Sequence, residues 1–85
     1  MSEVVVYTTN ACGFCARVKM LLKAREIDYR EINIAGDPEA FVELAKSTGH
    51  MTMPQVFVGD AFVGGYQETA EADRSGRLQE LLAAA

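Results

Sequence analysis

The stretch Val4–Leu22, VVVYTTNACGFCARVKMLL, decides the fold because it joins two different hydrophobic patterns across one short turn. Its first part, Val4–Thr8, is β-branched and aromatic, which favours a buried strand. The apolar positions of its last part are Cys15, Val18, Leu21 and Leu22. Their spacing is that of one helical face, and basic residues take the other directions. The stretch predicts a strand, then an amphipathic helix that extends to about Arg25.

Capping and turn residues divide the rest of the chain. We expect a strand over Tyr29–Ile34, followed by a helix that begins at Asp37-Pro38 and ends at Gly49. Two strands, over Gln55–Val58 and Ala61–Val63, are then joined by a tight turn at Gly59-Asp60. A last helical stretch begins at Tyr66 and breaks near Gly76. The inward face of the second helix is expected to be Phe41, Leu44 and Ala45. The order βαβαββα predicts a parallel first strand pair and an antiparallel closing hairpin.

Composition narrows the classes of function. With 85 residues, 49% of them hydrophobic, we expect one domain over residues 1–85. A net charge of -4 argues against nucleic acid, whose binding relies on many Lys and Arg contacts. The apolar run Val4–Tyr7 follows acidic Glu3 and is too short for a signal peptide or a membrane span. We therefore expect a cytoplasmic protein with no membrane partner, where a lone cysteine pair serves chemistry more often than structure.

The two cysteines, Cys12 and Cys15, allow three interpretations. Cys12 lies at the start of the first helix, where unpaired N–H groups and the helix dipole favour a thiolate nucleophile. Cys15 lies one turn further on, on the apolar face, which suits a resolving thiol. The pair can instead be inert, or can form half of a zinc site, but with His50 the chain offers three of four ligands and needs a second chain. A redox couple is the leading interpretation.

Three ordered blocks of the chain resemble the glutaredoxin family. They are C-G-F-C at residues 12–15, Thr52–Phe57 (TMPQVF), which is similar to the family's T-V-P block, and Gly64-Gly65 before a helix with an acid at Glu68. The resemblance, to a small dithiol glutaredoxin, runs along almost the whole chain. It implies a thioredoxin-like α/β fold, with a four-stranded mixed sheet, helices on both faces and a cis bond before Pro54.

The resemblance also implies an activity and a binding site. The activity is reduction of protein disulfides and glutathione mixed disulfides with glutathione, through Cys12 as nucleophile and Cys15 as resolving thiol. The implied glutathione-binding residues are Phe14, Thr52, Met53, Pro54, Gly65, Tyr66, Gln67 and Glu68. The backbone at Thr52-Met53 would pair with the cysteinyl part of glutathione. The N–H groups of Tyr66 and Gln67 would bind the γ-glutamyl carboxylate, and Glu68 its ammonium group.

Plainer interpretations stand beside these roles. Gly64-Gly65 can be an ordinary strand-to-helix turn, and Glu68 can serve only the start of its helix. His50 is expected to be an exposed loop residue. Thr9 stands where many relatives carry a lysine, and loss of such a cation weakens glutathione binding by about fivefold at most. Basic residues around the first helix can partly compensate; they are Arg17, Lys19, Lys23, Arg25 and Arg30.

Two further functions remain open. C-G-F also begins the C-G-F-S motif of monothiol glutaredoxins, which resemble iron–sulfur carriers; here two otherwise monomeric chains would share a [2Fe-2S] cluster through Cys12 and two glutathiones. Against this, Cys15 replaces the serine. The other is a redoxin that serves ribonucleotide reductase and is reduced by thioredoxin reductase. The sheet of such a redoxin ends in a tryptophan-containing segment, where this chain has Gly64–Tyr66.

Overall fold

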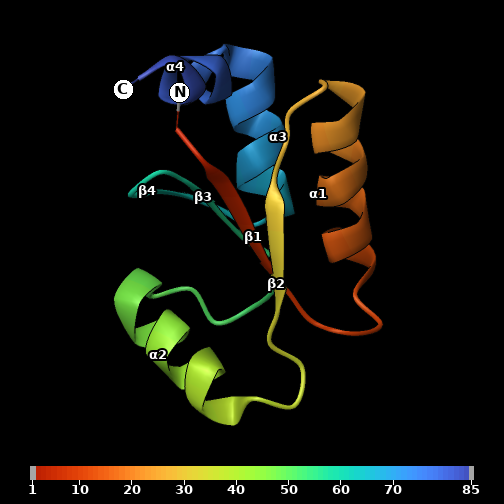
Figure 1. Ribbon diagram of the computed structural model, residues 1–85, viewed down its shortest axis with the longest axis vertical. Coiled ribbons are helices and arrows are strands. Elements are labelled where there is room, and N and C mark those ends of the chain that lie inside the picture. Colours follow the sequence, from red (N-terminus) through yellow and green to blue (C-terminus); the bar gives the residue numbers. More distant parts are fainter. Residues whose placement is uncertain (1, 85) are drawn as a thin grey trace.

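A four-stranded sheet forms the centre of the computed structural model, which describes residues 2–84 (Figure 1). The elements are β1 (Val4–Thr8), α1 (Gly13–Ala24), β2 (Arg30–Asn33), α2 (Pro38–Thr48), β3 (Gln55–Val58), β4 (Ala61–Gly64), α3 (Tyr66–Ser75) and α4 (Arg77–Ala83). The strand order is β2-β1-β3-β4; β1 is parallel to β2, and the other two pairs are antiparallel. The expected mixed sheet is confirmed. No helix within residues 2–84 has the length and apolar character needed to cross a membrane.

The element boundaries differ from the expected ones in strands β2 and β4, and β4 includes Gly64 beyond the expected Ala61–Val63. Strand β2 is shorter by one residue at each end than Tyr29–Ile34, although Ile34 N still donates to Thr8 O at 2.9 Å. The last helical stretch breaks at Gly76, as predicted, because Gly76 adopts the left-handed conformation (φ 86°) that ends α3 and begins α4. Gly49 (φ 73°) ends α2 in the same way, as predicted.

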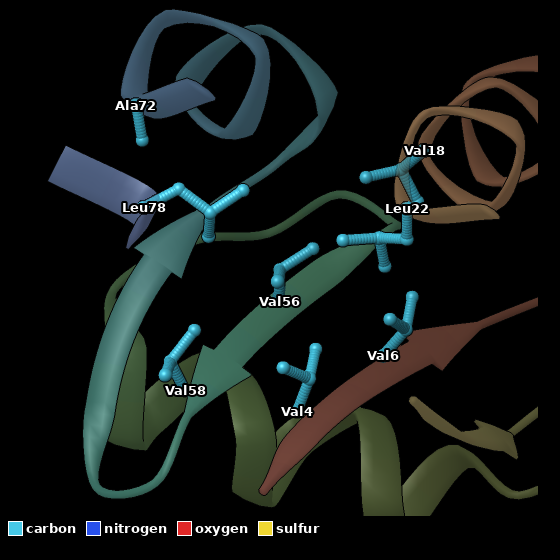
Figure 2. Packing of buried hydrophobic residues seen from close by; sticks show 8 residues of the cluster. All are labelled: Val4, Val6, Val18, Leu22, Val56, Val58, Ala72 and Leu78. Carbon is cyan, nitrogen blue, oxygen red and sulfur yellow. The ribbon is translucent and has the colours of Figure 1, made fainter. Parts of the chain in front are cut away.

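The main core lies between one face of the sheet and helices α1, α3 and α4. Figure 2 shows its side chains converging between these elements; they are Val4, Val6, Val18, Leu22, Val56, Val58, Ala72 and Leu78. Strand β1 alternates strictly between buried and half-buried residues, as the period of a strand requires. The apolar face predicted for α1 is confirmed, since its buried residues are Cys15, Val18 and Leu22. This packing holds α1 across the sheet and fixes where its N-terminus stands.

Helix α2 covers the opposite face of the sheet, apart from the other helices (Figure 1). The inward face predicted at Phe41, Leu44 and Ala45 is confirmed, since all three are half-buried, although α2 has no fully buried residue. This side of the sheet carries a row of aromatic rings, in which Phe57 lies 5.7 Å from Tyr7 and 5.2 Å from Phe62 between ring centres. The α2 side is therefore a smaller cluster than the main core.

An ion pair joins the end of α1 to α3. Arg25 Nε donates to both carboxylate oxygens of Asp73 at 3.1 Å, and Gln79 Nε2 donates to Asp73 Oδ1 at 3.1 Å. The hydrogen bond from Arg25 is the main cause that lowers the pKa of Asp73, against the opposing effect of burial. The charge on this carboxylate therefore stabilises the fold at neutral pH, and that contribution is lost as the pH falls through the lowered pKa.

Two α1 side chains test the main core. We expect Leu22→Ala to lower the free energy of unfolding by about 2–5 kcal/mol, because Leu22 is fully buried and the substitution leaves a cavity. Met20→Ala, on the same helix but 69% exposed, should change it by less than about 0.5 kcal/mol. Urea unfolding of both variants measures the difference. Similar losses in the two variants would contradict the assignment of the core.

Candidate active site

Cys12 occupies the N-cap position of α1. Its backbone is extended (φ −115°, ψ 106°), and its Sγ accepts a hydrogen bond from Cys15 N at 3.1 Å. The first turn of α1 carries no acidic side chain, so no carboxylate competes for the free N–H groups. This position favours negative charge on the sulfur, as the sequence predicts.

Cys15 lies directly beneath Cys12, and the two form a disulfide with their Cα atoms 5.2 Å apart. Cys15 is 3% exposed, whereas Cys12 is half-buried, which confirms the inward position expected for Cys15. Cys12 Sγ also lies 3.7 Å from the carbonyl oxygen of Met53. One sulfur of the pair is thus accessible at the helix start, and the other is shielded by the core.

A hollow opens beside this pair, between the N-terminus of α1, the segment before β3 and the start of α3. Its lining residues are Phe14, His50, Thr52, Met53, Pro54, Gly65, Tyr66, Gln67 and Glu68. The structure therefore brings together all eight residues expected to bind glutathione, and adds His50. We refer to this hollow as the active-site pocket.

The segment before β3 forms one wall of the active-site pocket. Thr52 is exposed, Met53 is half-buried and Pro54 is buried. The Met53–Pro54 peptide bond is cis, as the resemblance implies. Because Met53 reaches both the pocket and Cys12, this wall connects the binding surface to the reactive sulfur.

The turn from β4 into α3 forms the facing wall. Glu68 Oε1 accepts a hydrogen bond from Gly65 N at 2.8 Å, which caps the helix. The helix-start role of Glu68 is therefore present, and it occupies one of the two carboxylate oxygens. Gly64 has φ 128°, and a methyl group there would stand 2.6 Å from Glu68 Cβ. The chain needs glycine at this position both for its backbone angle and for the close approach of Glu68.

An aromatic pair forms the rim between α1 and α3. The rings of Phe14 and Tyr66 stack with centres 6.0 Å apart, and the Arg17 guanidinium lies 5.8 Å and 5.7 Å from the two ring centres. Three of the other basic residues near α1 are in ion pairs with acidic side chains; they are Lys19, Arg25 and Arg30. Among the five basic residues expected around the first helix, Arg17 is the one that contacts the aromatic lining of the pocket.

His50 is the pocket residue outside the eight that the resemblance implies. It is half-buried instead of exposed, its ring packs edge-on against Phe62 at 5.7 Å, and its Nε2 lies 3.4 Å from where a Gly65 side chain would begin. Both partners come from later parts of the chain, so no local pattern around His50 indicates the contact. Thr9, in contrast, borders an adjoining hollow that shares Met53 with the pocket.

Comparisons with known proteins agree with this geometry. The glutaredoxin family model matches residues 4–63. A curated glutaredoxin of Pseudomonas aeruginosa is 42% identical over 84 residues, which cover 99% of this chain and 100% of that protein. Glutaredoxin 3 of Escherichia coli is 33% identical over 82 residues, covering 96% and 99%.

Solved structures show the same architecture. A buckwheat glutaredoxin–glutathione complex superposes with a TM-score of 0.87 at 33% identity, over 95% of this chain and 76% of that one. A glutaredoxin from Brucella melitensis superposes with a TM-score of 0.86 at 35% identity, over 96% and 89%. The fold of these neighbours is the thioredoxin-like α/β fold expected from the sequence.

The glycine at the facing wall supplies a test. We expect Gly64→Ala to destabilise the protein by about 1–3 kcal/mol, because φ 128° is strained for alanine and its methyl group meets Glu68. Gly13→Ala is the matched control and should not destabilise the protein. A methyl group there meets nothing within 4 Å, and alanine has a higher helix propensity than glycine. Thermal unfolding compares the two. A Gly64→Ala protein as stable as the Gly13→Ala protein would show that the wall does not depend on glycine.

Proposed function

The chain belongs to the glutaredoxin family of thiol–disulfide oxidoreductases, and we propose that it uses glutathione to reduce protein disulfides and glutathione mixed disulfides. The observation that carries this proposal is the active-site pocket beside Cys12, lined by all eight residues expected for glutathione. The similar buckwheat protein in complex with glutathione supports the same ligand.

Cys12 acts as the nucleophile in this proposal. In the reduced protein its thiolate attacks the glutathione sulfur of a mixed disulfide, the substrate's thiolate leaves and takes up a proton, and a Cys12–glutathione disulfide remains. The N–H group that reaches Cys12 Sγ from Cys15 stabilises the attacking sulfur. A second glutathione thiolate then attacks the bound glutathione sulfur, which releases oxidised glutathione and restores Cys12.

Cys15 acts as the resolving thiol. When Cys12 has attacked a protein disulfide, one substrate sulfur has left as a thiol and the other is joined to Cys12. The Cys15 thiolate then attacks Cys12 Sγ, and this second substrate sulfur leaves as a thiolate that takes up a proton. The product is the Cys12–Cys15 disulfide, the state that this structure has. Two glutathione molecules then reduce the pair. The burial of Cys15 supports this division of roles, because a shielded thiol reaches its neighbour more readily than it reaches a protein substrate.

The pocket residues bind glutathione by their position. The backbone at Thr52-Met53 pairs with the cysteinyl part. The N–H groups of Tyr66 and Gln67 at the start of α3 bind the γ-glutamyl carboxylate, and the remaining oxygen of Glu68 binds its ammonium group. The rings of Phe14 and Tyr66 enclose the apolar part of the ligand. We place this activity in the cytoplasm, where the glutathione pool is kept reduced.

Cluster binding is a second candidate function, favoured by the position of half-buried Cys12 at the helix start and by the open space around Gly13. No group of three or more His, Cys, Asp or Glu side chains within residues 2–84 is arranged to hold a metal ion. A [2Fe-2S] cluster would therefore take Cys12 from each of two chains and a thiolate from each of two bound glutathiones. When bound, the cluster would supply iron–sulfur transfer, whereas formation of the Cys12–Cys15 disulfide would remove its ligand.

The division of roles between the cysteines is tested by serine substitution. We expect Cys12→Ser to abolish all thiol exchange, because it removes the nucleophile. Cys15→Ser should keep removal of glutathione from a glutathionylated peptide and lose reduction of an intramolecular protein disulfide. A glutathione-coupled assay measures both reactions. Equal loss of both in Cys15→Ser, or turnover only with thioredoxin reductase, would refute the proposal.

Anaerobic reconstitution with iron, sulfide and glutathione tests the second candidate. We expect a coloured dimer on a sizing column for the wild type and Cys15→Ser, and a colourless monomer for Cys12→Ser or without glutathione, because these remove cluster ligands. A colourless monomer from both the wild type and Cys15→Ser would rule out cluster binding.

A further inference from the structure

Gln55 is a fully buried polar side chain beside the active-site pocket, which it does not line. It is the first residue of β3, directly after Pro54. Its Nε2 donates to His50 O at 2.6 Å and to Thr52 O at 3.3 Å, while its Oε1 accepts from Thr48 Oγ1 at 2.9 Å. Three of the four hydrogen bonds that a glutamine can make are therefore directed at the end of α2 and at the pocket wall.

Thr48, the last residue of α2, completes this network. Its Oγ1 accepts from His50 N at 3.1 Å, and its single proton can be donated to Gln55 Oε1 at 2.9 Å or to Leu44 O at 3.0 Å. The two side chains together hold one N–H group and two carbonyl groups of the segment His50–Thr52. We call these contacts the Gln55–Thr48 clamp.

The other contacts of the wall given above are the approach of Cys12 Sγ to Met53 O and the packing of the His50 ring against Phe62. Within residues 2–84, no backbone-to-backbone hydrogen bond outside the strands involves His50–Pro54. A buried polar group without a partner costs about 1–3 kcal/mol, so the fully buried amide of Gln55 favours the conformation of the segment that supplies its partners. The segment held in this way provides four of the nine residues that line the pocket; they are His50, Thr52, Met53 and Pro54.

We propose that Gln55 is a positioning residue, which sets the affinity for the glutathione moiety by holding the pocket wall His50–Met53 in place. This inference rests on the proposed function. Gln55 touches neither the ligand nor the reacting sulfur, and acts through the backbone that presents Met53 to both. Its loss should therefore weaken substrate binding more than the chemical step.

Gln55→Met tests the inference, because methionine keeps the unbranched shape and removes every polar contact. With a glutathionylated peptide as substrate, we expect KM to rise about tenfold, as loss of one buried hydrogen bond of about 1.4 kcal/mol gives a factor of ten. At saturating substrate, kcat should stay within about twofold. Val58→Ala is the control, since Val58 is a buried residue of the same strand whose side chain faces the main core.

Thr48→Val provides a milder variant that removes the hydroxyl group and nearly keeps the shape. It should raise KM in the same direction, and the double variant Thr48→Val/Gln55→Met should show less than the product of the two effects, because both break one network. Hydrogen exchange at the His50 amide should become faster in each variant, since this amide donates to Thr48 Oγ1.

The outcomes separate the two proposals. A wild-type protein with no activity on the glutathionylated peptide would refute the proposed function itself. The positioning role alone would be overturned if the wild type is active but the KM values of Gln55→Met and Thr48→Val equal that of Val58→Ala. A fall in thermal stability with unchanged KM would likewise assign Gln55 a purely structural part. If Gln55→Met does not fold, the KM and the His50 exchange rate of Thr48→Val decide the matter.

Discussion

The packing of α1 against β1 is the contact on which the rest of the structure depends. Val18 and Leu22 of the helix are buried against Val4 and Val6 of the strand. Because the turn between the two elements is short, this contact determines where the N-terminus of α1 stands relative to the sheet. It places Cys12 half-buried beside the active-site pocket and Cys15 in the interior. The packing that stabilises the fold therefore also makes the two sulfurs differ in accessibility.

The two walls of the active-site pocket are held by different physical means. The wall at α3 depends on backbone geometry, since Gly64 adopts an angle that side chains disfavour and Glu68 folds back onto Gly65 N. The wall before β3 makes side-chain hydrogen bonds with Gln55, which also bonds to Thr48. A ligand between them meets backbone groups that are already oriented, and pre-orientation of this kind lowers the entropy lost on binding.

Two carboxylates of the chain, those of Glu31 and Asp73, are held by hydrogen-bonded partners that stabilise the fold. Glu31 accepts a hydrogen bond from Thr8 and pairs with Lys19, and the bond from Thr8 is the main cause that lowers its pKa. Asp73 is held by Arg25 in a similar way. Although the protein has a net charge of -4, the active-site pocket has groups that suit an anion, because the start of α3 offers N–H groups and Arg17 lies at the rim.

The sequence by itself determined those features that depend on local patterns. The strand–helix pattern of Val4–Leu22, the Asp37 cap and the left-handed glycine at Gly49 act within a few residues, and the structure has each of them. The C-G-F-C spacing likewise places two thiols on one helical turn whatever surrounds them. The eight pocket residues were found through the resemblance to a family, which carries tertiary information in its motifs.

Only the tertiary structure decided the partial burial of α2, the position of His50 and the network of Gln55. The face of α2 follows the local helical period, but how deeply it is buried depends on a sheet made from the whole chain. His50 is held by Phe62 and stands against Gly65, and the burial of Gln55 follows from the packing of β3. The contacts of His50 join segments that strand pairing brings together. Gln55 bonds to residues three to seven positions away, but its burial depends on the packing of the sheet, and the sequence does not show whether a glutamine is exposed or fully buried.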